Sequence, residues 1–88
     1  MDLTDLRKEI DQIDDELVQL FCKRMHIASL VADYKKATGS PIHHPGRAQE
    51  ILRRVAEKAG PELEAYIQSL YTTIFELSRN YQNRHNNG

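Results

Sequence analysis

The first 38 residues contain neither glycine nor proline, and their apolar residues recur three and four positions apart. This spacing is the seam of an amphipathic helix with a heptad period. Asp2 precedes the seam as a candidate N-cap, and Gly39 followed by Pro41 is a typical helix stop. The pattern therefore predicts one helix over about residues 3–37, roughly 50 Å long. The seam residues are Leu3, Leu6, Ile10, Ile13, Leu17, Leu20, Ile27, Val31 and Tyr34.

Two shorter helices and a polar tail are predicted after this stop. Pro45 suits the first turn of a helix, and Gly60 followed by Pro61 separates that helix from the next one. The tail is expected to be frayed or to begin a linker to another domain. The sequence thus predicts an all-α fold in a single domain. The expected segments are residues 45–59, 61–83 and 84–88 for the tail, within a domain over 1–88.

A monomer with this pattern would leave much of the first helix uncovered. The second and third helices are roughly 20 and 35 Å long, and they can cover only one side of the first. A long exposed apolar seam is an association surface, and a chain of 88 residues buries a smaller share of its surface than a longer one. We therefore expect an intertwined homodimer with antiparallel first helices. A monomeric three-helix hairpin is the alternative.

Charge and motifs argue against several functional classes. The net charge is -1 without a block of like charge, so no nucleic acid and no membrane is expected as a partner. Neither a signal peptide nor a membrane span is apparent, and Cys22 has no second cysteine, which suits a reducing cytoplasmic setting. His43 and His44 are adjacent, which is poor spacing for one ion, so no metal site is expected. Phosphate-loop and serine-nucleophile motifs are missing.

Cationic residues occupy positions that the pattern assigns to the interior. The seam through Leu17 and Leu20 continues to Arg24, where a leucine is expected. A buried guanidinium without an anionic partner is very costly. Lys35 lies eleven residues later, close to three turns and about 16 Å along the axis. Arg47 is in register with the inward positions of the second helix, so several cations should converge.

Two polar residues of the third helix extend this set. Ser78 and Gln82 are four residues apart and share one face. Taken alone, each of these residues is typical of a helix surface, and so is Arg7 beside the seam. Arg24, Lys35 and Arg47 together nevertheless place several cations inward, and the pattern offers no matching inward carboxylate. Two interpretations of Arg24 follow: it binds an anionic ligand, or it pairs with a carboxylate across the dimer.

The pattern as a whole resembles the all-helical, type II chorismate mutases, and most of all the mutase domain often fused to prephenate dehydratase. The resemblance implies an isomerase that converts chorismate to prephenate by an intramolecular Claisen rearrangement, in phenylalanine and tyrosine biosynthesis. It also implies three helices per chain in an intertwined dimer with two equivalent sites, and no cofactor. The matching segments are Leu6–Asp14, Arg24, Val31–Lys35, Arg47, Ser78 and Gln82.

The resemblance also implies roles for individual residues. Lys35 and Gln82 match the catalytic donors to the ether oxygen of a compact dianionic substrate. Helix length supports an exchange between chains, since Arg7 and Lys35 lie 28 residues apart, about 42 Å along one straight helix. The matching substrate-binding positions are Arg7 from the partner chain, and Arg24, Arg47 and Ser78 from the same chain.

Two positions depart from the family pattern. The family usually has a glutamate directly after the arginine of the second helix and often an aspartate three residues before it. Ala48 and His44 stand at these places. Both family carboxylates lie near the ring hydroxyl, so the resemblance leaves recognition of that hydroxyl open, with Gln49 or Glu50 as imperfect substitutes. Isochorismate pyruvate lyases share the fold and can lack that glutamate, which keeps this activity as an alternative. A non-catalytic helical dimerisation or regulatory module is another.

Overall fold

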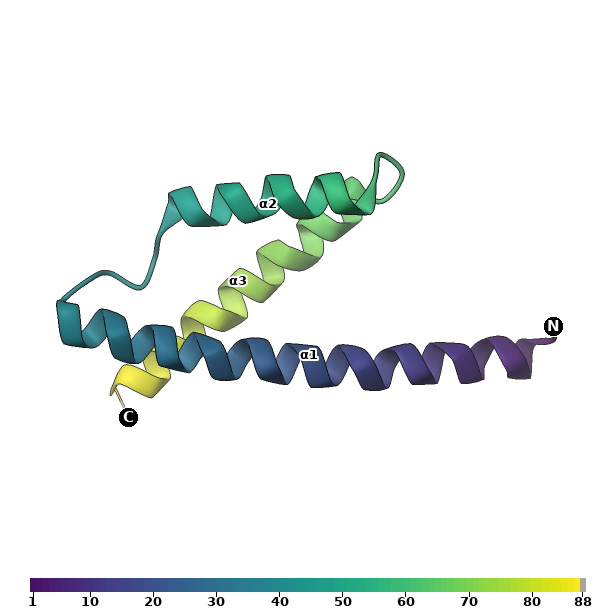
Figure 1. Cartoon of the computed structure of the whole chain (residues 1–88), viewed down its shortest axis with the longest axis horizontal. Coiled ribbons are helices and arrows are strands. Elements are labelled where there is room, and N and C mark those ends of the chain that lie inside the picture. The colour runs from purple at the N-terminus through teal and green to yellow at the C-terminus, as the bar shows by residue number, and fades with distance from the viewer. Residues whose placement is uncertain (88) are drawn as a thin grey trace.

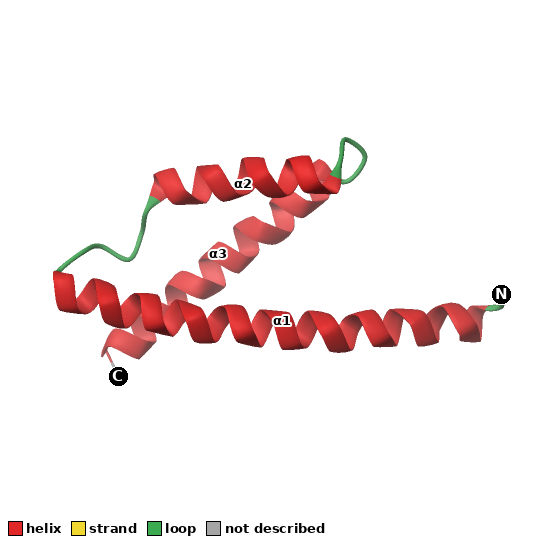
Figure 2. Cartoon of the chain, in the orientation of Figure 1, coloured by secondary structure: helices red, strands yellow, loops and turns green. Residues whose placement is uncertain are grey.

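The computed structural model describes residues 1–87, which form three helices and no strand (Figures 1 and 2). The prediction of an all-α chain with a long first helix is confirmed. Within the described part of the chain, no helix has the length of apolar sequence that a membrane crossing requires. The helices are α1 (Leu3–Thr38), α2 (Pro45–Ala59) and α3 (Glu64–Asn87).

Both ends of α1 are closed by local interactions. The Asp2 side chain accepts a hydrogen bond from the Asp5 backbone N–H at 2.9 Å, and the Asp5 side chain accepts one from the Asp2 N–H, which makes a capping box. Gly39 ends the helix with φ 72°, a left-handed conformation that costs a glycine little. The end observed at Thr38 lies one residue beyond the prediction.

The start of α2 is set by a histidine cap. His44 Nδ1 accepts a hydrogen bond from the backbone N–H of Arg47 at 3.1 Å, and Pro45 occupies the first turn. The predicted bounds of this helix, 45–59, agree with the structure. The cap matters for the site, because it fixes where the first turn of α2 presents its side chains.

The third helix differs from the prediction at its start. It begins at Glu64, and residues 61–63 form a turn instead. The Leu63 N–H donates to the Gly60 carbonyl at 3.2 Å within that turn. The Ile67 N–H donates to the Leu63 carbonyl at 2.9 Å, so regular helical hydrogen bonding starts from Leu63.

The predicted frayed tail is also wrong for the described residues, since α3 continues through Asn87. Its last turns are tied to the end of α1. Lys36 Nζ donates to the Asn86 carbonyl at 2.8 Å, and Asn86 Nδ2 donates to the Ala32 carbonyl at 3.2 Å. His85 Nε2 lies 2.7 Å from a carboxylate oxygen of Asp33. Gly88 lies outside the described residues.

The arrangement leaves half of α1 uncovered. α3 packs against both other helices, which do not pack on one another, and α1 extends well past both toward the N-terminus (Figure 1). The chain measures 54 × 28 × 14 Å, and no large side chain among residues 1–87 is fully buried. Apolar side chains on the projecting half of α1 are instead exposed, namely Leu3, Leu6, Ile10, Ile13, Leu17, Val18 and Leu20.

Candidate active site

A cavity of about 380 Å³ lies where the second half of α1, the start of α2 and the second half of α3 meet. This is within the usual size range of small-molecule sites. Its apolar wall includes Ile27, Val31, Ile51 and Phe75. Among its lining residues within 1–87, none is Asp or Glu. Five are cations: Arg24, Lys35, Arg47, Arg54 and Arg79.

The structure brings five of the six predicted site residues to this cavity and leaves one outside. Arg7 is exposed on the projecting half of α1 and does not line the cavity of its own chain. The helix separates it from Lys35 by about 42 Å, as the sequence predicts. The five residues that do line the cavity are Arg24, Lys35, Arg47, Ser78 and Gln82.

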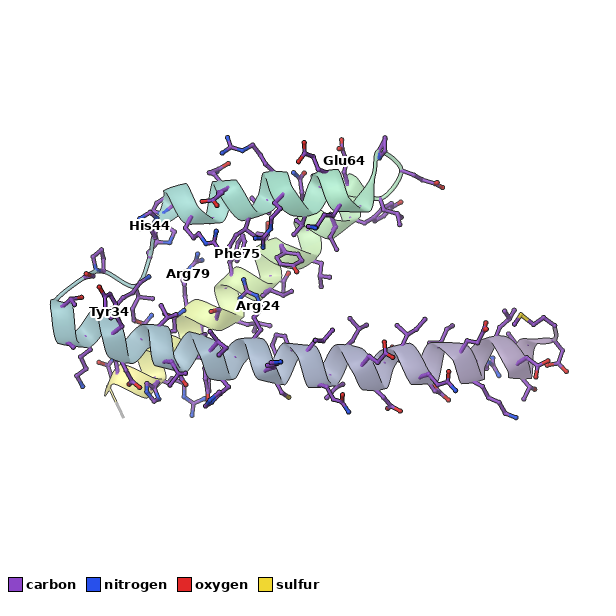
Figure 3. The ribbon with its side chains drawn as sticks, in the orientation of Figure 1. Arg24, Tyr34, His44, Glu64, Phe75 and Arg79 are labelled. Carbon is purple, nitrogen blue, oxygen red and sulfur yellow. The ribbon has the colours of Figure 1, made fainter. Side chains whose placement is uncertain are left out.

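Arg24 has an aromatic environment in place of a carboxylate partner. Its guanidinium carbon lies 5.9 Å from the ring centroids of both Tyr71 and Phe75, and the side chain is half-buried (Figure 3). Aromatic faces attract a guanidinium and hold it in place without neutralising its charge. No ion pair involves Arg24 among residues 1–87. Within one chain, its positive charge therefore remains available for an anion in the cavity.

Lys35 is half-buried and positioned by the chain segment that follows α1. Its Nζ donates a hydrogen bond to the Ile42 carbonyl at 2.8 Å. An ammonium group has three N–H bonds, so two donors remain for other acceptors. The same contact joins α1 to the connection between α1 and α2, in which Ile42 and His43 line the cavity.

Ser78 and Gln82 are buried and bonded to each other. Gln82 Nε2 donates to Ser78 Oγ at 3.0 Å, and Gln82 Oε1 is buried without a partner among the described residues. Rotating the amide by a half-turn lets the Ser78 hydroxyl donate to Oε1 and frees both N–H bonds of Nε2. A buried polar atom without a partner is costly, which favours a ligand that bonds with it.

Arg47 reaches the cavity from the first turn of α2 and is the most exposed of the predicted cations that line it. One of its terminal nitrogens lies 3.0 Å from a carboxylate oxygen of Glu50, and the two side chains are 53% and 61% exposed. Such a solvent-exposed pair contributes about 0–1 kcal/mol. An incoming carboxylate therefore displaces Glu50 at little cost.

The sequence reasoning missed two cations of the cavity, Arg54 and Arg79. Arg54 lies seven residues after Arg47, two helical turns on the same face, so its position was readable from the sequence. Arg79 follows Ser78 directly and lies four residues after Phe75, but only the packing of α3 decides that it lines the cavity. Neither makes an ion pair or side-chain hydrogen bond among residues 1–87.

The cavity is suited to binding a small polyanion. Cations surround an apolar wall, and a buried amide supplies a neutral donor. Electrostatic attraction is strong in such a partly desolvated space. In the described part of the chain, no group of three His, Cys, Asp or Glu side chains lies close enough together to hold a metal ion. Binding and orienting an anion is the chemistry that these residues support.

Comparison with known proteins gives a consistent family assignment. The family model for type II chorismate mutases matches residues 6–83. The T-protein of Haemophilus influenzae is 49% identical over 61 residues, which are 66% of this chain and 16% of that protein. The bifunctional chorismate mutase/prephenate dehydratase of Aquifex aeolicus is 39% identical over 54 residues, 61% of this chain and 15% of that protein.

A third relative aligns over most of both chains. The 4-amino-4-deoxychorismate mutase of Streptomyces venezuelae is 31% identical over 75 residues, 83% of this chain and 73% of that protein. In contrast, the chain spans less than a fifth of the length of the other two relatives. The matched region includes every residue placed in the cavity above.

Proposed function

The chain belongs to the type II chorismate mutase family, and on this premise we propose that its cavity rearranges chorismate to prephenate. The observation that carries the proposal is a cavity with five cations and no carboxylate among its described lining residues. The reaction is intramolecular and needs no nucleophile, so binding and electrostatics suffice for catalysis. The bifunctional relative supports a fused or partner enzyme domain for this chain as well.

In the proposed mechanism, the arginines fix the shape of the substrate. Arg24 and Arg47 form bidentate hydrogen bonds with its carboxylates, and the apolar wall contacts the ring. Holding the flexible enolpyruvyl arm over the ring creates a near-attack conformation. Because Tyr71 and Phe75 hold the Arg24 guanidinium in place, less side-chain entropy is lost when the substrate binds.

Lys35 and Gln82 act on the bond that breaks. Negative charge builds on the ether oxygen as its bond to the ring lengthens. The remaining N–H bonds of Lys35 and the amide of Gln82 donate to that oxygen from fixed positions, which stabilises the transition state more than the ground state. Ser78 holds the amide and contributes to substrate binding.

We further propose that the active protein is a homodimer in which Arg7 of one chain completes the site of the other. The uncovered apolar half of α1 supports this assembly, because it is too extensive for a stable monomer surface. Two antiparallel α1 helices cover each other's seams. If Arg7 lies opposite the middle of the partner's 24–35 segment, the two-fold axis passes near residue 18. That position is about halfway between residue 7 and the middle of the segment.

A cysteine crosslink tests this register. In a Cys22→Ser background, Val18→Cys should form an intermolecular disulfide readily, since Val18 is 62% exposed and lies beside the proposed axis. Lys8→Cys is the matched control, because its two copies would be about 30 Å apart on antiparallel helices. The readout is a non-reducing gel of folded protein. Failure of the Val18 crosslink, or a folded and active monomer in sedimentation at micromolar concentration, would contradict the proposal.

The activity itself is tested with purified protein and chorismate. Loss of chorismate is followed by absorbance, and the product is identified by chromatography; prephenate is the expected product. A parallel assay with isochorismate distinguishes the lyase alternative, whose products are pyruvate and salicylate. Turnover of neither compound would favour a non-catalytic module.

A further inference from the structure

The proposed reaction leaves a half-buried cation of the cavity without a role. Arg79 projects from α3 into the space between α1 and α2, toward the end of α2 that His44 caps (Figure 3). In the proposed mechanism, Arg24, Arg47 and the partner's Arg7 bind the carboxylates of the dianionic substrate. Lys35 donates to its ether oxygen. Arg79 makes no ion pair or side-chain hydrogen bond among residues 1–87, although a half-buried guanidinium gains from a partner.

Among residues 1–87, the lining of the cavity near Arg79 includes no Asp or Glu that could accept a hydrogen bond from a ring substituent. Ala48 lines it with a methyl group. The ring of His44 also lines it, but its Nδ1 already accepts the N–H of Arg47. Arg79 itself is a pure donor with a permanent positive charge. This part of the cavity therefore bonds with a substituent that accepts hydrogen bonds and disfavours one that carries a positive charge.

We propose that Arg79 is a specificity-determining residue whose guanidinium donates a hydrogen bond to the ring hydroxyl oxygen and excludes rings that carry an ammonium group. This inference rests on the proposed function. A hydroxyl group both donates and accepts, so it is recognised either by a carboxylate or by a guanidinium. An alkyl ammonium has no lone pair to offer, and its charge is repelled by Arg79 in a partly desolvated cavity.

The test compares chorismate with 4-amino-4-deoxychorismate as alternative substrates. The parent should have a kcat/KM for chorismate at least about 10-fold higher, the effect of one hydrogen bond to a charged group. Arg79→Gln should reduce this ratio by about 10-fold, and Arg79→Glu should reverse the preference toward the amine. Arg84→Gln is the control, because it removes the same charge from an exposed position of α3 outside the cavity.

The ratio of kcat/KM for chorismate to kcat/KM for 4-amino-4-deoxychorismate separates a role of Arg79 in specificity from a structural role. A variant that merely loosens the fold lowers both specificity constants together and leaves their ratio unchanged. As a second readout, calorimetry measures binding of unreactive bicyclic dicarboxylates with and without the ring hydroxyl. The parent should bind the hydroxylated form about 10-fold more tightly, whereas Arg79→Gln should distinguish the two forms by less than about 3-fold.

The outcomes distinguish this inference from the function on which it rests. If the parent converts chorismate but both Arg79 variants keep the parental ratio, Arg79 does not contact the ring substituent and the inference is wrong. If the parent converts neither compound and binds neither dicarboxylate, the proposed function is wrong and the inference falls with it.

Discussion

Replacing Lys35 with methionine should lower kcat for chorismate on the order of 100-fold or more, the cost of removing a preorganised donor to developing charge. Methionine keeps most of the length of the side chain and removes its charge and all its donors. The effect should exceed that of Gln82→Ala, because a charged donor stabilises the oxygen more than a neutral one. The measurement is kcat at saturating chorismate for each variant.

Lys35 also holds the connection between α1 and α2 through the Ile42 carbonyl, so two controls are needed. Lys23→Met removes a lysine from an exposed position of α1 outside the cavity and should leave kcat within about 2-fold. Thermal unfolding of Lys35→Met shows how much stability the lost contact costs, on the order of 1 kcal/mol for one hydrogen bond. A folded Lys35→Met variant with less than about a 3-fold loss in kcat would show that this ammonium does not act on the breaking bond.

Changing Gln82 to glutamate should make the reaction strongly dependent on pH. An ionised carboxylate at this position repels the dianion and cannot donate to the ether oxygen, so kcat/KM should fall on the order of 100-fold at neutral pH. A protonated carboxyl group regains one O–H donor. Activity should therefore be lowest above the pKa of the introduced group and recover as the pH decreases through it.

The profile of kcat/KM from about pH 5 to pH 8 measures this effect directly. Gln82→Ala is the matched control, because it removes the donor without adding a titratable group and should keep the shape of the parent's profile. Ser78 can donate to either form of the glutamate, so its contact does not distinguish them. A Gln82→Glu profile that follows the parent's would mean that residue 82 does not contact the breaking bond.

The sequence alone determined the features that depend on neighbouring residues. The seam and its glycine stop define α1 almost to the residue, because a hydrophobic repeat and a cap act within a few positions of the chain. The same periodicity placed Arg24, Lys35 and Arg47 on inward faces, and all three line the cavity. The separation of Arg7 from Lys35 follows from the rise of a helix alone.

Tertiary contacts decided the rest. The last turns of α3 stay helical because Asn86 and His85 bond with Ala32, Asp33 and Lys36, more than 45 positions away in the sequence. Arg79 lines the cavity only because α3 packs against both other helices. Such contacts depend on which helices lie next to each other in space. The periodicity of one helix does not show which other helix it will contact. The sequence thus predicted which side of each helix faces inward, whereas packing decided which inward residues share one cavity.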